Sequence, residues 1–224
     1  MTPVVHAPPR PPSERRTNGR IPPAPPDFGG DGDDDREHGP RRGLDNLRLA
    51  VLFFMGAEAM FFGALISALL VLRLGMAAWP PPLEPRLPIA ITGLNTLVLL
   101  ASSVTLVTAG RARRRGEPAR HVRWLQGTAA LGALFLAVQG YEWIRLIGFG
   151  LSLASGVYGT TFFALIGLHG LHVLAALVWL LITTALVARG RFVDGHIAPV
   201  QACAMFWHFV VGVWPVLYFT VYLI

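Results

Sequence analysis

The sequence predicts an all-α membrane protein with five transmembrane helices in one bundle, and three observations support this fold class. Hydrophobic residues make up 53% of the 224 residues and charged residues only 14%, against about 25% charged residues in typical soluble proteins. Five apolar stretches each reach the about 20 residues that a helix needs to cross a bilayer. Arginine, the only strong base present, gathers between alternate stretches.

The first 48 residues form a polar tail that we expect to be disordered. They hold 10 of the 18 prolines, with eight arginines balanced by eight acidic residues. Without an apolar face, nothing offsets the entropy lost when such a segment becomes ordered. Binding of a partner by the Pro-rich part is the alternative to a flexible extension.

Residues 49–224 form the predicted membrane domain. Because the backbone in lipid must satisfy its own hydrogen bonds within each segment, the apolar stretches are expected to be helices rather than strands. The five predicted helices cover residues 49–72, 88–109, 124–147, 158–187 and 198–224.

The distribution of arginine predicts the orientation of this bundle. The second loop carries six arginines and the fourth carries two, whereas the third loop has none. Basic loops remain in the cytoplasm. We therefore expect a cytoplasmic N-terminus and a C-terminus outside, which is periplasmic in a bacterial inner membrane. The orientation of the chain in the membrane explains these arginines better than a role in binding nucleic acid does.

The first helix carries Glu58, about nine residues and thus about 14 Å into the membrane. A charged group at the bilayer centre costs at least about 2.5–3.5 kcal/mol on insertion scales, so it must be paired, protonated or functional. Two interpretations stay open. Glu58 is either a proton-linked or lipid-contacting carboxyl, or a neutral, hydrogen-bonded glutamate at a helix contact.

The third helix carries Gln139, Glu142 and Arg145 on one face, because three-residue spacing aligns side chains on a helix. Near the outer end of the helix, a local pair between Glu142 and Arg145 is expected, with the arginine reaching toward lipid headgroups.

The fourth and fifth helices carry His169, His172 and His208. Embedded carboxylates are too few for a di-iron site, which needs glutamates on several facing helices. A bis-histidine haem site between His169 and His208 is a remote alternative. The favoured interpretation is that these histidines form hydrogen bonds across the bundle, with no metal or catalytic role in this chain.

Small residues are expected where helices approach closely inside a membrane. The helix-packing candidates are Gly56 and Gly63 in the first helix and Gly167 and Gly170 in the fourth. Pro215 is expected to disturb the fifth helix.

Several stretches together resemble subunit III of haem–copper oxidases. They occur in the order of that family and include all five predicted helices: FFMGAEAMFFGALI (53–66), GLNTLVLLASSVTLVTA (93–109), QGYEW (139–143), VYGTTFFALIGLHGLHVLAALVWLL (157–181) and AMFWHFVVGVWPVLYFTVYLI (204–224). The chain is similar to the five-helix members, which lack the first two of seven helices.

The resemblance implies a non-catalytic subunit of a proton-pumping cytochrome c oxidase in aerobic respiration. It would pack on subunit I, with subunit II in the same complex, and support proton uptake there. It would bind phospholipid but no haem or copper, which belong to the partner subunits. The family's buried carboxyl corresponds to Glu58, and its Q-x-x-E segment corresponds to Gln139 and Glu142. Its HG-x-H pair corresponds to His169 and His172, and its W-H-F element to Trp207 and His208.

The chain departs from the family pattern at Val211, where many members have Asp after WHFV. The helix motifs leave open a subunit III-like partner of a quinol oxidase or nitric oxide reductase. A small membrane transporter is the remoter alternative, since neither repeats nor clearly broken helices surround a midplane site.

Overall fold

The computed structural model describes residues 46–77, 79, 88–152, 156–191 and 197–223, and every regular element in these ranges is helical. Five spans are long and apolar enough to cross a membrane, which confirms the predicted fold class. Their elements are α1 (Asn46–Leu74), α2 (Ile89–Arg114), α3 (Pro118–Gly148), α4 (Val157–Phe162) continued by the π-helical turn η1 (Phe163–Gly167) and α5 (Leu168–Ala188), and α6 (Ala198–Tyr218) continued by η2 (Phe219–Leu223). Of the predicted tail, residues 1–45 lie outside the described residues, and residues 46–48 begin α1.

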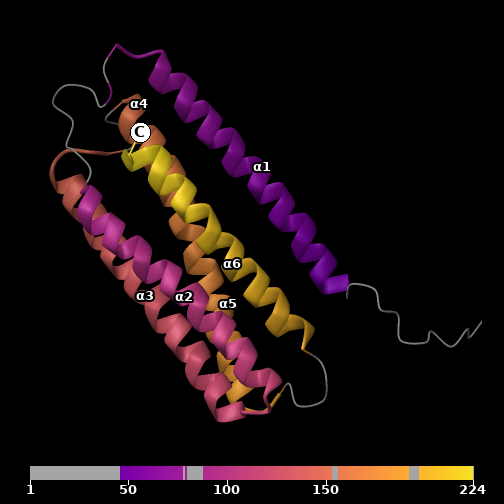
Figure 1. Cartoon of the computed structure of the whole chain (residues 1–224). Coiled ribbons are helices and arrows are strands. Elements are labelled where there is room, and N and C mark those ends of the chain that lie inside the picture. The colour runs from indigo at the N-terminus through magenta and orange to yellow at the C-terminus, as the bar shows by residue number, and fades with distance from the viewer. Residues whose placement is uncertain (1–45, 78, 80–87, 153–155, 192–196, 224) are drawn as a thin grey trace, which may run out of the picture. The chain divides into compact units, whose positions relative to one another are not determined.

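Helix α6 occupies the middle of the bundle and contacts α1, α2 and α5. Helices α2 and α3 form an antiparallel hairpin, and α3 also packs on α5. Helix α1 runs beside α6 on the side away from this hairpin (Figure 1). It is the least buried of the five spans, so most of its surface faces outward.

The hairpin between α2 and α3 is tighter than predicted, because both helices extend into the arginine-rich loop. Arg111, Arg113 and Arg114 form the last turn of α2. Arginine is a good helix former, and cations are favoured at a helix C-terminus, so hydropathy alone placed this boundary too early. The turn is a Schellman motif: Gly116, at φ +72°, donates its N–H to Arg113 O, and Glu117 donates to Ala112 O.

Two tryptophans of α6 form the centre of the core. Trp214 and Trp207 are almost completely buried. The indole N–H of Trp214 donates to Thr96 Oγ1 at 2.9 Å, and that of Trp207 donates to Ser102 Oγ at 3.1 Å. The ring of Trp214 also meets the edge of Phe135 on α3, with centroids 5.0 Å apart. Helix α6 is thereby joined to α2 and α3 by both apolar and polar contacts.

Pro215 lies inside α6, as the sequence indicated. Proline has no backbone N–H and therefore removes one hydrogen bond of the α-helical pattern. The α-helix changes to the π-helical η2 at Phe219, one turn further on. The fourth span contains a similar π-helical turn, η1, directly before the HGLH segment.

Glycine at position 132 of α3 is expected to be essential for this packing, since an added Cβ would overlap the ring of Trp207. Gly132→Ala should destabilise the chain by about 1–3 kcal/mol through overpacking. That loss corresponds to about 2–4 °C in melting temperature per kcal/mol for a protein of this size. Thermal unfolding of the purified protein in detergent measures the effect.

Gly140→Ala in the same helix is the matched control, because a Cβ there meets nothing within 4 Å. It should leave the melting temperature unchanged or raise it, since alanine is the better helix former. Equal melting temperatures for the two variants would contradict the packing described for Trp207.

Candidate functional site

The carboxyl group of Glu58 on α1 faces α5, where its Oε2 lies 3.1 Å from Nε2 of His172. Both side chains are only 18% exposed. Phe62, one turn further along α1, presents its ring to the His172 ring with centroids 5.3 Å apart. Glu58 therefore has a partner within the chain, which is one of the conditions expected of a carboxyl at the predicted depth.

The second ring nitrogen of His172 faces its own helix. Nδ1 lies 2.7 Å from the carbonyl oxygen of Leu168, which can only accept a hydrogen bond. Nδ1 therefore acts as a donor, and Nε2 is the nitrogen that faces Glu58. The 3.1 Å contact between Nε2 and Oε2 of Glu58 is an ion pair when His172 is protonated, and such a pair has no net charge, which suits an apolar setting.

His169 does not form the hydrogen bond across the bundle that the sequence predicted. The residue is 1% exposed, and neither ring nitrogen has a hydrogen-bond partner among the described residues. Its ring instead stacks on Trp214, with centroids 5.1 Å apart and planes at 25°. The apolar character of the ring face explains this placement, because stacking needs no polar partner.

His208 does form a contact across the bundle: its Nδ1 hydrogen-bonds to Ser103 Oγ of α2. The candidate haem pair is not supported by this geometry, since His208 is bonded to a hydroxyl and His169 lies against Trp214. Within the described ranges, no group of three or more His, Cys, Asp or Glu side chains could hold a metal ion.

Glu142 and Arg145 take different direct partners from those that the sequence predicts, although Arg145 lies near enough to interact with the charge of Glu142. Glu142 is 3% exposed and accepts a 2.8 Å hydrogen bond from Thr92 of α2. Arg145 is exposed and lies over the rings of Tyr141 and Phe149, each 5.9 Å from its guanidinium carbon. Three-residue spacing allows the pair, but the neighbouring helix offers Glu142 a buried donor that the sequence could not reveal.

Gln139 is buried beside Glu142 and donates to the hydroxyl of Tyr222 in η2, at 3.4 Å. The Q-x-x-E segment thus joins α3 to both α2 and the end of the fifth span. Sequence reasoning missed Thr92 and Tyr222. A threonine in an apolar helix is a weak signal, because its hydroxyl can bond its own backbone, and a tyrosine there is a weak signal because most of its side chain is an apolar ring.

The four glycines predicted for helix packing fall into two groups. At Gly170 an added Cβ would overlap the ring of Trp143, so this glycine does serve a helix contact. At Gly56, Gly63 and Gly167 it would meet nothing within 4 Å, so they make no close contact within the described chain. Close packing at these three positions would require another molecule.

Val211, which stands where many members of the resembled family have Asp, is buried in α6 at 3% exposure. Its surroundings belong to the continuous apolar core of the bundle. A valine at this position is therefore consistent with the packing of the chain.

Comparison with known proteins gives one consistent result. Residues 37–224 match the family model described as cytochrome c oxidase subunit III. Cytochrome c oxidase subunit 3 of Synechocystis sp. is 36% identical over 193 residues, which cover 84% of this chain and 79% of that protein. The protein of the same name from Corynebacterium diphtheriae is 31% identical over 179 residues, covering 79% and 87%.

A third relative, cytochrome c oxidase subunit 3 of Lumbricus terrestris, is 37% identical over 182 residues, covering 79% of this chain and 69% of that protein. The family match extends through all five membrane spans and the paired Glu58. The chain therefore belongs to the cytochrome c oxidase subunit III family and is a subunit III of a haem–copper oxidase, within a complex of oxidase subunits.

Proposed function

We propose that this chain docks on the catalytic subunit I, with subunit II in the same complex, and supports proton uptake without a redox centre of its own. The observation that carries the proposal is the incomplete packing of α1. This helix has the smallest buried share of the five spans, although it carries the paired carboxyl of Glu58.

The outer face of α1 has the composition of a surface that another molecule covers. Phe53 is 73% exposed and Met60 is 78% exposed. Gly56 and Gly63 lie on the same side with open space above them. Small residues flanked by large apolar ones allow a neighbouring helix to approach closely in a membrane. Subunit I and bound phospholipid are the occupants that we propose for this face.

The pair formed by Glu58 and His172 supports a role in proton supply. A proton held by this pair would move between nitrogen and oxygen without changing the net charge of the pair, because the two groups lie 3.1 Å apart. A group of this kind can hold a proton near the membrane midplane at little electrostatic cost. On this proposal haem and copper belong to the partner subunits.

The proposed location is a bacterial inner membrane with the N-terminus in the cytoplasm. This orientation is supported by the arginines around the α2–α3 turn, because basic residues oppose the translocation of a loop across the membrane. Arg48 at the start of α1 is close enough to Arg113 at the end of α2 for their charges to interact. This proximity is consistent with both lying on one side of the membrane.

Topology is testable with reporters fused after Ile224. Alkaline phosphatase, which is active only outside the cytoplasm, should be active at this position, and green fluorescent protein exported there should stay dark. Measuring both signals in intact cells checks the result. A fluorescent, phosphatase-negative pair of fusions would reverse the proposed orientation.

Docking through α1 predicts a specific defect for Gly63→Leu. The added side chain meets open space within the chain, so the subunit should fold with an unchanged melting temperature. It should, however, obstruct a neighbouring helix and lower the amount of subunit I that co-purifies with tagged subunit III.

Assays of the purified complex with cytochrome c and with quinol identify its electron donor.

Met60→Leu on the same helix is the control, because it conserves an exposed apolar side chain. It should retain subunit I at the wild-type level. If Gly63→Leu retains as much subunit I as the control does, this stripe faces lipid rather than the catalytic subunit.

Replacement of Glu58 by glutamine tests the proton-linked role. The amide can still donate to Nε2 of His172, so folding and assembly should be preserved while the exchangeable proton is lost. We expect a near-normal initial rate of oxygen reduction followed by faster inactivation during sustained turnover. Oxygen consumption followed over many turnovers, beside Met60→Leu, measures this. An unchanged active lifetime would assign Glu58 to packing alone.

A further inference from the structure

His208 lies at mid-membrane depth and is only half-buried in the bundle. It follows Ala198, the first residue of α6, by ten positions. That spacing corresponds to about 15 Å along the helix, which is the middle of a hydrocarbon core of about 30 Å. The hydrogen bond that His208 forms within the chain joins α6 to Ser103 of α2 and uses only Nδ1 of the ring.

Nε2, the second ring nitrogen of His208, has no hydrogen-bond partner among the described residues and reaches the surface of the bundle. Lipid tails offer no hydrogen-bond partner, and no water fills the core of a bilayer. A polar group left without a partner in such surroundings costs free energy. The position of Nε2 therefore indicates that something other than a lipid tail covers it.

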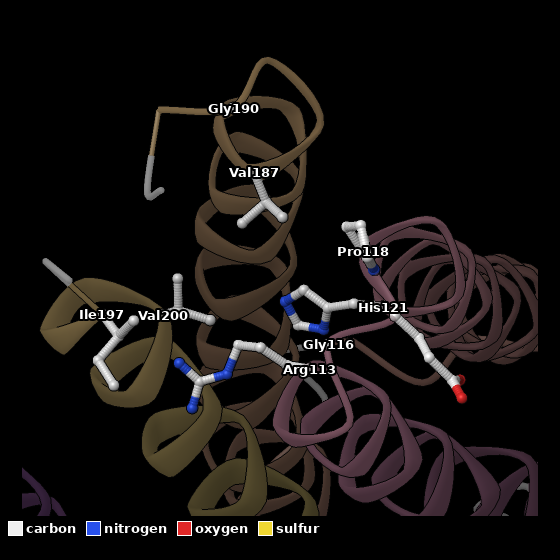
Figure 2. A pocket seen from close by; sticks show the side chains of 9 residues that line it. Arg113, Gly116, Pro118, His121, Val187, Gly190, Ile197 and Val200 are labelled. Carbon is white, nitrogen blue, oxygen red and sulfur yellow. The ribbon is translucent and has the colours of Figure 1, made fainter. Parts of the chain in front are cut away.

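The other histidines in the described spans meet their surroundings differently. His169 and His172 contact a ring and a carboxyl group of neighbouring helices. His121 also has an unpartnered Nε2, but this atom is buried at the arginine-rich end of the bundle, where the ring lies near Arg113 (Figure 2). Among the histidines that the structure describes, His208 alone combines an unpartnered nitrogen, a place at the surface and mid-membrane depth.

The surface around this nitrogen has the features of a helix contact. Gly212 and Val216 follow His208 at four-residue spacing and so share its face of α6. Gly212 is exposed, with open space where a Cβ would lie, and Val216 is 50% exposed. A glycine one turn from a polar residue lets a second backbone approach closely enough for a hydrogen bond. The α2–α6 face consists of His208, Gly212 and Val216 from α6 and Leu100, Ser103 and Val107 from α2.

The contact with Ser103 indicates what kind of partner Nε2 needs. The serine hydroxyl has one proton, and Nδ1 of His208 is the acceptor that lies beside it. When Nδ1 accepts this proton, the neutral ring carries its own proton on Nε2, which is then a donor. The complementary group is an oxygen acceptor in a hydroxyl, amide or carboxyl side chain.

We propose that the α2–α6 face docks a transmembrane helix of another oxidase subunit, which places an oxygen-bearing side chain opposite Nε2 of His208. A helix is the occupant that fits, because lipid headgroups lie about 15 Å away at the membrane surface and acyl chains cannot accept a hydrogen bond. The chain is a subunit of an oxidase complex, so such helices are available. This contact uses other residues than the docking proposed for α1 and does not depend on it.

The first test places the photo-crosslinking amino acid p-benzoylphenylalanine at Val216 in the whole purified oxidase complex. Illumination should link α6 to a transmembrane segment of another subunit, and mass spectrometry of the linked peptides should find an oxygen-bearing side chain near the middle of that segment. Leu94 is the control position, because it is 67% exposed and lies on the opposite side of α2 from Ser103. Links from Val216 to lipid alone, or the same linked segment from both positions, would overturn the proposal.

The second test compares His208→Phe with Ser103→Ala in the same complex. Both variants lose the hydrogen bond between α2 and α6, but only His208→Phe also loses Nε2. His208→Phe should therefore speed dissociation of the linked subunit in detergent about two- to tenfold, the factor expected for one neutral hydrogen bond. Ser103→Ala should leave that rate near the wild-type value. Equal rates for the two variants would assign His208 to packing within the chain and reject the docking contact.

Discussion

The arrangement of the helices depends on a constraint of the membrane, where a buried N–H donor is costly unless it finds an acceptor inside the protein. The two tryptophans of α6 show how the chain meets it. Their indole groups donate to Thr96 and Ser102 on α2. The ring of Trp214 meanwhile stacks on His169 of α5 and meets Phe135 of α3. One side chain therefore sets the spacing of four helices, and glycines at the contact positions make room for large rings.

This arrangement leaves α1 in a different position from the other helices. Helices α2, α3 and α6 are joined by several interhelical hydrogen bonds, whereas α1 contacts α5 through the polar pair of Glu58 with His172 and through the ring of Phe62. In lipid, apolar side chains gain little from leaving one hydrocarbon surface for another. The polar pair therefore has a large share in fixing the rotation of α1, and the rest of that helix remains available to other subunits.

The buried polar groups of the bundle are treated differently at different depths. Deep in the predicted membrane, Glu58 is paired with His172 within the chain. At the arginine-rich end, Nε2 of His121 is buried without a hydrogen-bond partner among the described residues.

The sequence by itself determined the five spans and the family, because each depends on composition and order along the chain. It also indicated the carboxyl of Glu58 and the close contact at Gly170. Helix ends near the arginines were missed, since hydropathy falls there while helix propensity does not.

Only the tertiary structure decided which partner each buried polar group takes. Glu142 bonds to Thr92, which is 50 positions away, rather than to Arg145 on its own helix. His169 stacks on Trp214, and three of the four predicted packing glycines face open space. The spacing of residues along a helix predicts which side chains share a face. Which helix packs against that face depends on the packing of the whole bundle, and the spacing does not reveal it.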